Sequence, residues 1–102
     1  MRTITRKELT KKLGAFRSVK NAPSRNGENA APNQFIIDYA NGVVFQSYDS
    51  VVAVKMKNGE LYFGSDHEYS VTTKRFVKAF SGHTNSERRR MLKDEVATLI
   101  VD

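Results

Sequence analysis

The apolar residues near the N-terminus are spaced as on one face of a helix. Leu9, Leu13 and Phe16 follow one another at i, i+4 and i+7, which places them on one narrow stripe of a helix. Thr5 and Glu8 precede them with the spacing of a capping box, in which each side chain accepts a hydrogen bond from the other residue's backbone N–H. The pattern predicts a helix over about residues 5–18.

The middle of the chain consists of short β-branched and aromatic runs separated by turn residues. The dipeptide Asn-Gly occurs between such runs at residues 41–42 and 58–59, and it is the strongest short hairpin signal. A further turn is expected near residues 49–50. These turns divide residues 35–63 into four consecutive strands, so we expect a four-stranded antiparallel β-meander.

The last third of the chain predicts two short helices and a strand. Residues 71–80 carry a helical apolar pattern that ends at Gly82, a natural helix stop. The segment Thr-Asn-Ser-Glu at 84–87 repeats the capping-box pattern and opens a helix that ends near residue 92. The apolar run 96–101 is expected to add a terminal strand to the sheet.

Together these elements define the expected fold class, α+β: an N-terminal helix, a four-stranded antiparallel β-meander, two short helices and a C-terminal strand. Residues 1–102 fit a single domain. Within it we expect a basic N-terminal helix over 1–19, a flexible loop over 20–33 and an α+β core over 34–102. The loop contains two prolines and an Asn-Gly pair but no large apolar residue, so the first helix would be tethered to the core.

Composition excludes several classes of site. The chain has no cysteine, which removes disulfides, thiolate zinc sites and cysteine nucleophiles and suits a reducing compartment. No apolar run reaches 18 residues and no apolar segment follows the basic N-terminus, so we expect a cytoplasmic protein without a membrane span or a secretory signal. Glycine-rich phosphate-binding motifs are also missing, and no cofactor is expected.

One acid–histidine–acid run is the best candidate for catalysis or metal binding. His67 lies between Asp66 and Glu68, and such groups can bind a metal ion or tune a general base. Adjacent residues in a loop point in different directions, however, so a solvated loop is the favoured interpretation. No serine lies in a G-x-S-x-G motif. We therefore expect a non-enzymatic protein with no catalytic residue and no metal site.

Basic residues are concentrated at the two ends of the chain. Residues 1–25 hold eight Lys or Arg against one Glu, residues 26–69 hold two against six acids, and residues 70–102 hold seven against four. The three segments thus carry net charges of +7, −4 and +3 within a total of +6. Such asymmetry indicates an anionic partner for one end, or contact between the basic end and the acidic middle.

The basic residues of the first helix are the strongest candidate for a binding site, because such a helix can lie against a phosphate backbone or an acidic protein surface. The arginine run in the last helix is a possible second contact, although successive helical residues project about 100° apart. The alternative for both groups is a solvated face that binds nothing specific. The candidate residues are Arg6, Lys7, Lys11, Lys12 and Arg17, with Arg88, Arg89 and Arg90 as the second contact.

Aromatic residues of the predicted strands offer another way to bind single strands, since exposed rings can stack on bases. The chain lacks the sequence signature of an RNA-recognition motif, and we expect most of these rings in the core. The rings concerned are Tyr39, Phe45, Tyr48, Tyr62 and Phe63.

Three stretches carry a resemblance to a known group of proteins. They are the strand-forming segment 45–54 with its Phe-Gln-Ser-Tyr start, the hairpin at 57–62, and the helix start Tyr-Ser-Val-Thr-Thr at 69–73. Over about residues 35–80 the chain resembles a family of small uncharacterised proteins encoded by bacteriophages. The resemblance implies an accessory phage gene acting in the host cytoplasm. It brings no activity, cofactor or functional residue.

These observations favour a small non-enzymatic phage-type binding protein that associates with nucleic acid through its basic N-terminal helix. The alternative is an inhibitor or modulator that docks on an acidic surface of a host protein, such as a defence or transcription enzyme. The free edges of a small sheet also invite pairing between two copies, so a homodimer is a further possibility.

Overall fold

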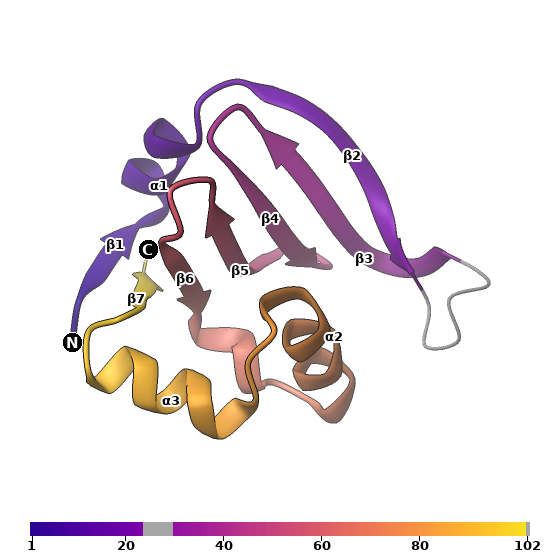
Figure 1. Cartoon of the computed structure of the whole chain (residues 1–102). Helices are drawn as coiled ribbons and strands as arrows, with labels where there is room; N and C mark the ends of the chain where they lie inside the picture. The colour runs from indigo at the N-terminus through magenta and orange to yellow at the C-terminus, as the bar shows by residue number, and fades with distance from the viewer. Residues whose placement is uncertain (24–29, 102) are drawn as a thin grey trace.

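A seven-stranded mixed β-sheet forms the centre of the molecule and carries helices on both faces (Figure 1). The structure is a computed structural model, and it describes residues 1–23 and 30–101. In chain order the elements are β1 (Thr3–Thr5), α1 (Arg6–Leu13), β2 (Phe16–Pro23), β3 (Ala30–Tyr39), β4 (Gly42–Ser47), β5 (Ser50–Met56), β6 (Leu61–Gly64), the 3₁₀-helix η1 (Ser65–Glu68), α2 (Val71–Ser81), α3 (Asn85–Lys93) and β7 (Thr98–Val101).

The strand order across the sheet is β1-β7-β6-β5-β4-β3-β2. Strands β2 to β6 run antiparallel to one another, whereas β7 is parallel to both of its neighbours, β6 and β1. The predicted four-stranded meander with a terminal strand is therefore wrong. It omits β1 and β2, and β7 lies inside the sheet and not at its edge.

The two missed strands lack the apolar alternation that a half-buried strand shows. Strand β1 has only three residues. Strand β2 lies at the edge of the sheet, and among its eight residues only Ala22 is buried. Because β2 is held mainly by backbone hydrogen bonds to β3, its polar sequence carries no strand signal.

The predicted N-terminal helix and loop also need correction. Helix α1 ends at Leu13, because Gly14 turns the chain with φ 76° and ψ −150°, a backbone conformation that favours glycine. The predicted loop over 20–33 is wrong at both ends, which belong to β2 and β3; residues 24–29 lie outside the described residues. The helix is not tethered either, since Leu9 and Leu13 are buried against the sheet.

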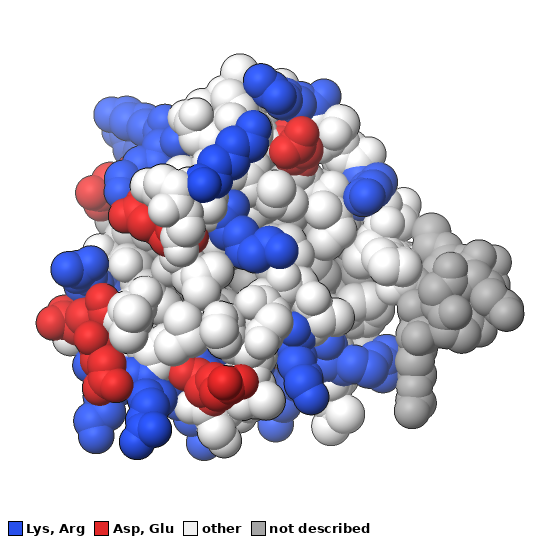
Figure 2. Space-filling view, in the orientation of Figure 1, with Lys and Arg blue, Asp and Glu red and all other residues white. Residues whose placement is uncertain are grey.

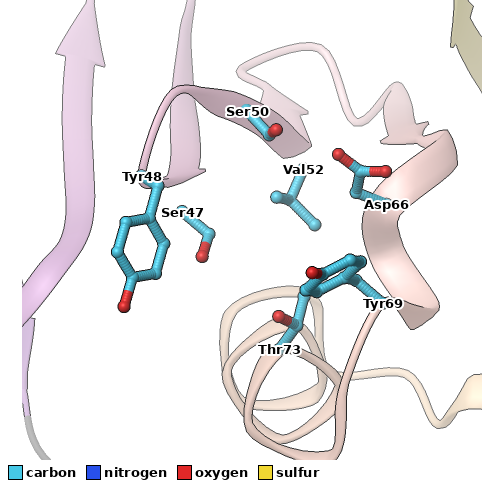
Figure 3. Close-up of a pocket in the computed structure, with 7 residues that line it drawn as sticks. All are labelled: Ser47, Tyr48, Ser50, Val52, Asp66, Tyr69 and Thr73. Atoms are coloured by element: carbon cyan, nitrogen blue, oxygen red, sulfur yellow. The ribbon is translucent and has the colours of Figure 1, made fainter.

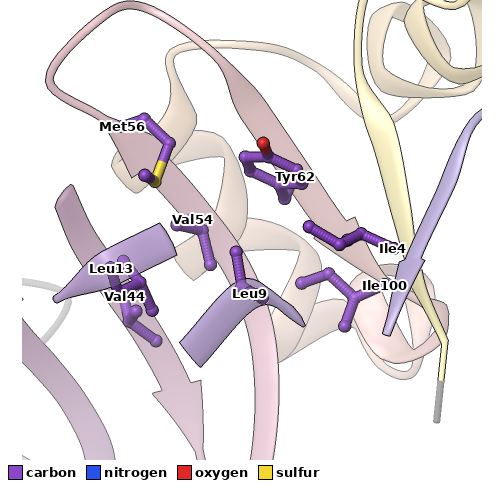
Figure 4. Close-up of a cluster of buried hydrophobic side chains, with 8 residues drawn as sticks. All are labelled: Ile4, Leu9, Leu13, Val44, Val54, Met56, Tyr62 and Ile100. Carbon is purple, nitrogen blue, oxygen red and sulfur yellow. The ribbon is translucent and has the colours of Figure 1, made fainter. Parts of the chain in front are cut away.

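One face of the sheet, the α1 face, packs on α1. Its buried cluster joins the two leucines of α1 to Val44, Val54 and Tyr62 of the central strands (Figure 4). Ile4 of β1 and Ile100 of β7 complete the same cluster. The first helix is thus an integral part of the core.

The opposite face, the α2–α3 face, packs on α2 and α3. Phe45 and Phe63 point to this side and are completely buried, together with Val77 of α2. A β-bulge at Val52 of β5 interrupts the alternation of side chains, so that the neighbours Val52 and Ala53 both pack on the α2–α3 face while Val51 and Val54 pack on the α1 face. Within the described residues, no helix is both long and apolar enough to cross a membrane.

Candidate nucleic-acid interface

Helix α1 is too short to cover its face of the sheet. Along β3, Ile37 and Tyr39 pack on the α1 face while Ile36 packs on the other, so Phe35 also points to the α1 face. The edge strand β2 continues this surface, because its residue opposite Ile37 is Val19. We call this uncovered surface the open face. It consists of Phe16, Val19, Phe35, Ile37 and Tyr39.

The open face presents apolar and aromatic groups to solvent. Phe16 is 58% exposed and Val19 is 54% exposed. The Phe16 ring meets the Tyr39 ring edge-on, with 6.0 Å between centroids and 76° between planes. Such an arrangement holds an aromatic ring in place while leaving one side of it free to stack.

A hollow of about 140 Å³ separates the open face from α1. Arg6 and Thr10 line it from the helix, and Tyr39 and Gln46 line it from the strands. The basic side chain of Arg6 therefore enters the boundary between helix and open face.

The other basic residues of α1 lie elsewhere on the helix. Leu9 and Leu13 face the sheet, so the positions of Lys7 and Lys11 lie on the opposite, outward side. On β2, Arg17 sits at an irregularity next to Phe16 and is exposed. The described residues place no carboxylate within ion-pair distance of Arg6, Lys7, Lys11 or Arg17.

Lys12 is the exception among the predicted contacts on α1. Its ammonium donates a hydrogen bond to the Tyr62 hydroxyl at 3.1 Å, and it lies 3.6 Å from a carboxylate oxygen of Glu60. The Tyr62 bond, with help from Glu60, raises the pKa of Lys12. Tyr62 in turn donates to Glu60 at 3.1 Å. Lys12 is thus engaged within the protein, and the basic side chains of α1 do not all converge on one point.

Figure 2 shows basic side chains gathered over α1 and the start of β2, along the top of the molecule. A second basic group follows the lower edge, over α2 and α3, with acidic side chains among them (Figure 2). The two groups correspond to the two basic segments of the sequence. They lie at opposite ends of the sheet, so they do not form one continuous surface on this side.

Arg88 cannot make the second contact that the sequence suggested. Its side chain is completely buried. Its guanidinium donates to Nδ1 of His67 at 3.0 Å, to the carbonyl of His83 at 2.8 Å, and to the carbonyl of His67 at 3.3 Å. A fourth bond goes to Oδ1 of Asn85 at 3.1 Å. All of these bonds are internal and hold η1 against α3.

Arg89 and Arg90, the next two residues of α3, differ from Arg88 in exposure and from each other in their partners. Arg89 pairs with Glu68 through two hydrogen bonds, and this pairing raises the pKa of Arg89 and lowers the pKa of Glu68. Arg90 is exposed. The three arginines fan around the helix as expected, so the second predicted contact is reduced to Arg90.

His67 is not a solvated loop residue, as the sequence had suggested. It is buried in η1, where it accepts the Arg88 hydrogen bond and packs on Phe63, with 5.7 Å between ring centroids. Burial, and then the nearby charge of Arg88, lower the pKa of His67. In the part of the chain that the structure describes, no cluster of three or more His, Asp or Glu could hold a metal ion.

The aromatic residues of the strands divide as the sequence analysis expected. Phe45, Tyr62 and Phe63 are core residues. Tyr39 is half-buried on the open face, and Tyr48 is 63% exposed at the β4–β5 turn. Phe16 was predicted on the apolar stripe of the first helix, but it opens strand β2 and is exposed, as is Val19. Their placement depends on β2, which has no strand signal of its own.

The chain matches the sequence model of a family of unknown function, DUF8033, over residues 17–96. The match contains the whole of the region that carried the resemblance noted above, and it begins after α1. Neither the curated proteins nor the solved structures provide a match. The match covers well over half of the chain, and the protein therefore belongs to the DUF8033 family of unknown function.

Proposed function

We propose that the protein binds single-stranded nucleic acid on the open face, with the phosphate backbone running past α1. The observation that carries this proposal is the exposed Phe16 ring beside a helix with unpaired basic side chains. Base–aromatic stacking tolerates any sequence, and basic side chains along the strand's path supply the salt-dependent attraction.

The form of the open face favours a single strand over a duplex. The rings of Phe16 and Tyr39 lie on a sheet surface and can stack only on bases that have left a double helix. Lys7 and Lys11 lie on the outward side of α1, where they would meet the phosphates of a strand that passes over the helix. The phage resemblance would place this activity in the cytoplasm of an infected cell.

The proposal is tested by the fluorescence anisotropy of a labelled 12-nucleotide strand at about 50 and 200 mM salt. If about four phosphates are contacted, the log–log slope against salt should be roughly −3 for a single strand. The double variant Lys7→Glu/Lys11→Glu should reverse most of this attraction. The variant Phe16→Ala should weaken binding by about tenfold while changing the salt slope little, since stacking contributes roughly 1–3 kcal/mol per base.

A matched control is the double variant Arg90→Glu/Lys93→Glu on α3, which makes the same charge change away from the open face. Binding that is insensitive to salt, or that weakens equally in both double variants, would overturn the proposed site.

A protein partner is the second candidate function, and the edge strand β2 favours it. Strand β2 pairs only with β3 among the described strands, so its outer edge offers backbone groups for an added strand. Phe16 and Val19 beside that edge would supply side-chain contacts. Variants distinguish the two candidate functions. Val19→Pro should block the addition of a partner's strand to β2, whereas substitutions of the basic residues of α1 should weaken oligonucleotide binding.

A further inference from the structure

We propose that a pocket at the end of the sheet, between Tyr48 and Tyr69, binds an unstacked guanine base of the bound strand. The inference rests on the proposed function and names a base-specific site for it. The evidence for it is a pocket outside the open face and the chemical character of the side chains that line this pocket.

The pocket has a volume of about 530 Å³, which is enough for a nucleoside. Tyr48, from the β4–β5 turn, lies on one side, and Asp66 and Tyr69 lie on the other (Figure 3). Val52 lies between them and provides an apolar floor (Figure 3). Three hydroxyl groups complete the lining, those of Ser47, Ser50 and Thr73.

Both tyrosine rings are held out toward solvent. Tyr48 is 63% exposed and Tyr69 is 81% exposed, although large aromatic side chains are usually covered. Two rings on opposite sides of a cavity with an apolar floor suit a flat, aromatic ligand. A base that has left its stack fits this description.

The backbone at Tyr48 supports a functional role. Its φ of 51° is in the left-handed region, which favours glycine or asparagine and costs a bulky residue of order 1 kcal/mol. The conformation is held by two hydrogen bonds: the Tyr48 N–H donates to the Asn33 carbonyl at 2.7 Å, and Gln46 Nε2 donates to the Tyr48 carbonyl at 2.8 Å. Strain of this kind is found at sites where a side chain must occupy one position.

The charged group in the wall selects the ligand. The pocket lining contains one carboxylate, Asp66, and no basic residue, so it disfavours a phosphate. Within the described residues the Asp66 carboxylate has no ion-pair partner. A carboxylate accepts two parallel hydrogen bonds. Among the four bases, only guanine presents two adjacent N–H donors, N1–H and the 2-amino group, on one edge.

A continuous path connects this pocket to the open face. Ser50 and Asp66 also line a neighbouring hollow of about 300 Å³, and Arg6 lines its other side. Arg6 then lines the hollow beside α1 as well. A strand lying on the open face can therefore pass Arg6, which is placed to meet a phosphate, and insert its next base beside Asp66.

The test compares labelled oligothymidine strands that carry one central guanine, inosine, adenine or cytosine. Inosine is the matched control, because it lacks only the 2-amino group of guanosine. The guanine strand should bind about tenfold more tightly than the inosine strand, as expected for one lost hydrogen bond to a charged group. The variant Asp66→Asn should abolish this preference while leaving affinity for the all-thymidine strand unchanged.

Two further variants test the walls. Tyr69→Ala should reduce the guanine preference, since the side chain is exposed and its loss leaves the core intact. Tyr48→Gly should do the same without loss of stability, because glycine relieves the positive φ. Equal binding of the guanine and inosine strands, or a preference that survives Asp66→Asn, would overturn this inference and leave the proposed function standing. No binding of any strand would overturn both.

Discussion

The two faces of the sheet are built from the same strands but differ in how completely they are covered. On the α2–α3 face, two helices and η1 seal Phe45 and Phe63 from solvent. On the α1 face, eight helical residues cover the central strands and leave β2 and β3 open. Successive residues of a strand point to opposite faces of the sheet, so the same strand contributes side chains to the sealed α2–α3 face and to the open face.

This difference separates stability from binding. The α2–α3 face contains most of the fully buried side chains and the Arg88 network, so changes there should unfold the protein. The open face contains exposed aromatic and apolar side chains, and unpaired basic side chains lie on the neighbouring helix α1, so changes there should alter binding and spare the fold. Three measurements test how sharp this division is.

The largest contrast is expected between two phenylalanines. Phe45→Ala removes a completely buried ring from the α2–α3 face and should lower the free energy of unfolding by about 3–5 kcal/mol. Phe16→Ala removes an exposed ring from the open face and should change it by roughly 0.5 kcal/mol or less. Urea denaturation of both variants measures the contrast. A large loss in Phe16→Ala would show that the open face is part of the core.

The next contrast lies within one helix. Arg88→Ala leaves His67 and two carbonyl groups without their buried donor, and it should cost about 3 kcal/mol. Arg90→Ala, two residues away and exposed, should cost less than about 0.5 kcal/mol. The same urea titration compares them. Equal effects would mean that the buried network contributes nothing measurable.

The smallest effect is expected from pH. Because burial and Arg88 lower the pKa of His67 in the folded state, the unfolded chain binds more protons at and below the ordinary histidine pKa of 6.5. The free energy of unfolding should therefore fall as pH is lowered from about 7.5 to 5, above the range where carboxylates titrate.

The matched variants for this measurement are His67→Gln, which keeps an acceptor for Arg88, and His83→Gln. The pH dependence of the urea midpoint should flatten in the first and persist in the second. Unchanged pH dependence in His67→Gln would assign the effect to another group.

Signals within a few residues of each other predicted the local structure correctly. The capping boxes of Thr5 with Glu8 and Thr84 with Glu87 are both present. Hairpins lie at both Asn-Gly pairs as expected, although the first turns at Ala40 and Asn41 and its Gly42 already belongs to β4. These features depend only on nearby backbone groups, so the sequence contains all the information they need.

Features that depend on distant partners were not predicted. Strand β2 is a strand because β3 lies beside it, and its own residues are almost all exposed. Arg88 is buried because His67, 21 positions earlier, accepts its hydrogen bond. The available signal was its position one turn before the buried Leu92, on the same side of α3.

The candidate site was predicted in part. All five basic residues proposed for the N-terminal helix region are exposed, and only Lys12 has an ion-pair partner among the described residues. The open face beside them depends on the length of α1 and on the pairing of β2. Neither could be read from the spacing of apolar residues.

The position of β7 has a consequence for the order of folding. This strand lies between β6 and β1, so β1 pairs with a segment almost the whole chain away, Thr3 with Leu99. During synthesis the first strand finds no neighbour until the last strand has emerged and entered the sheet. Such distant contacts slow folding. Helix α1, which follows β1 directly, packs on β4, β5 and β6 and can dock before β7 has formed, so the surface proposed to bind nucleic acid does not wait for the last strand, whereas the pairing of β1 does.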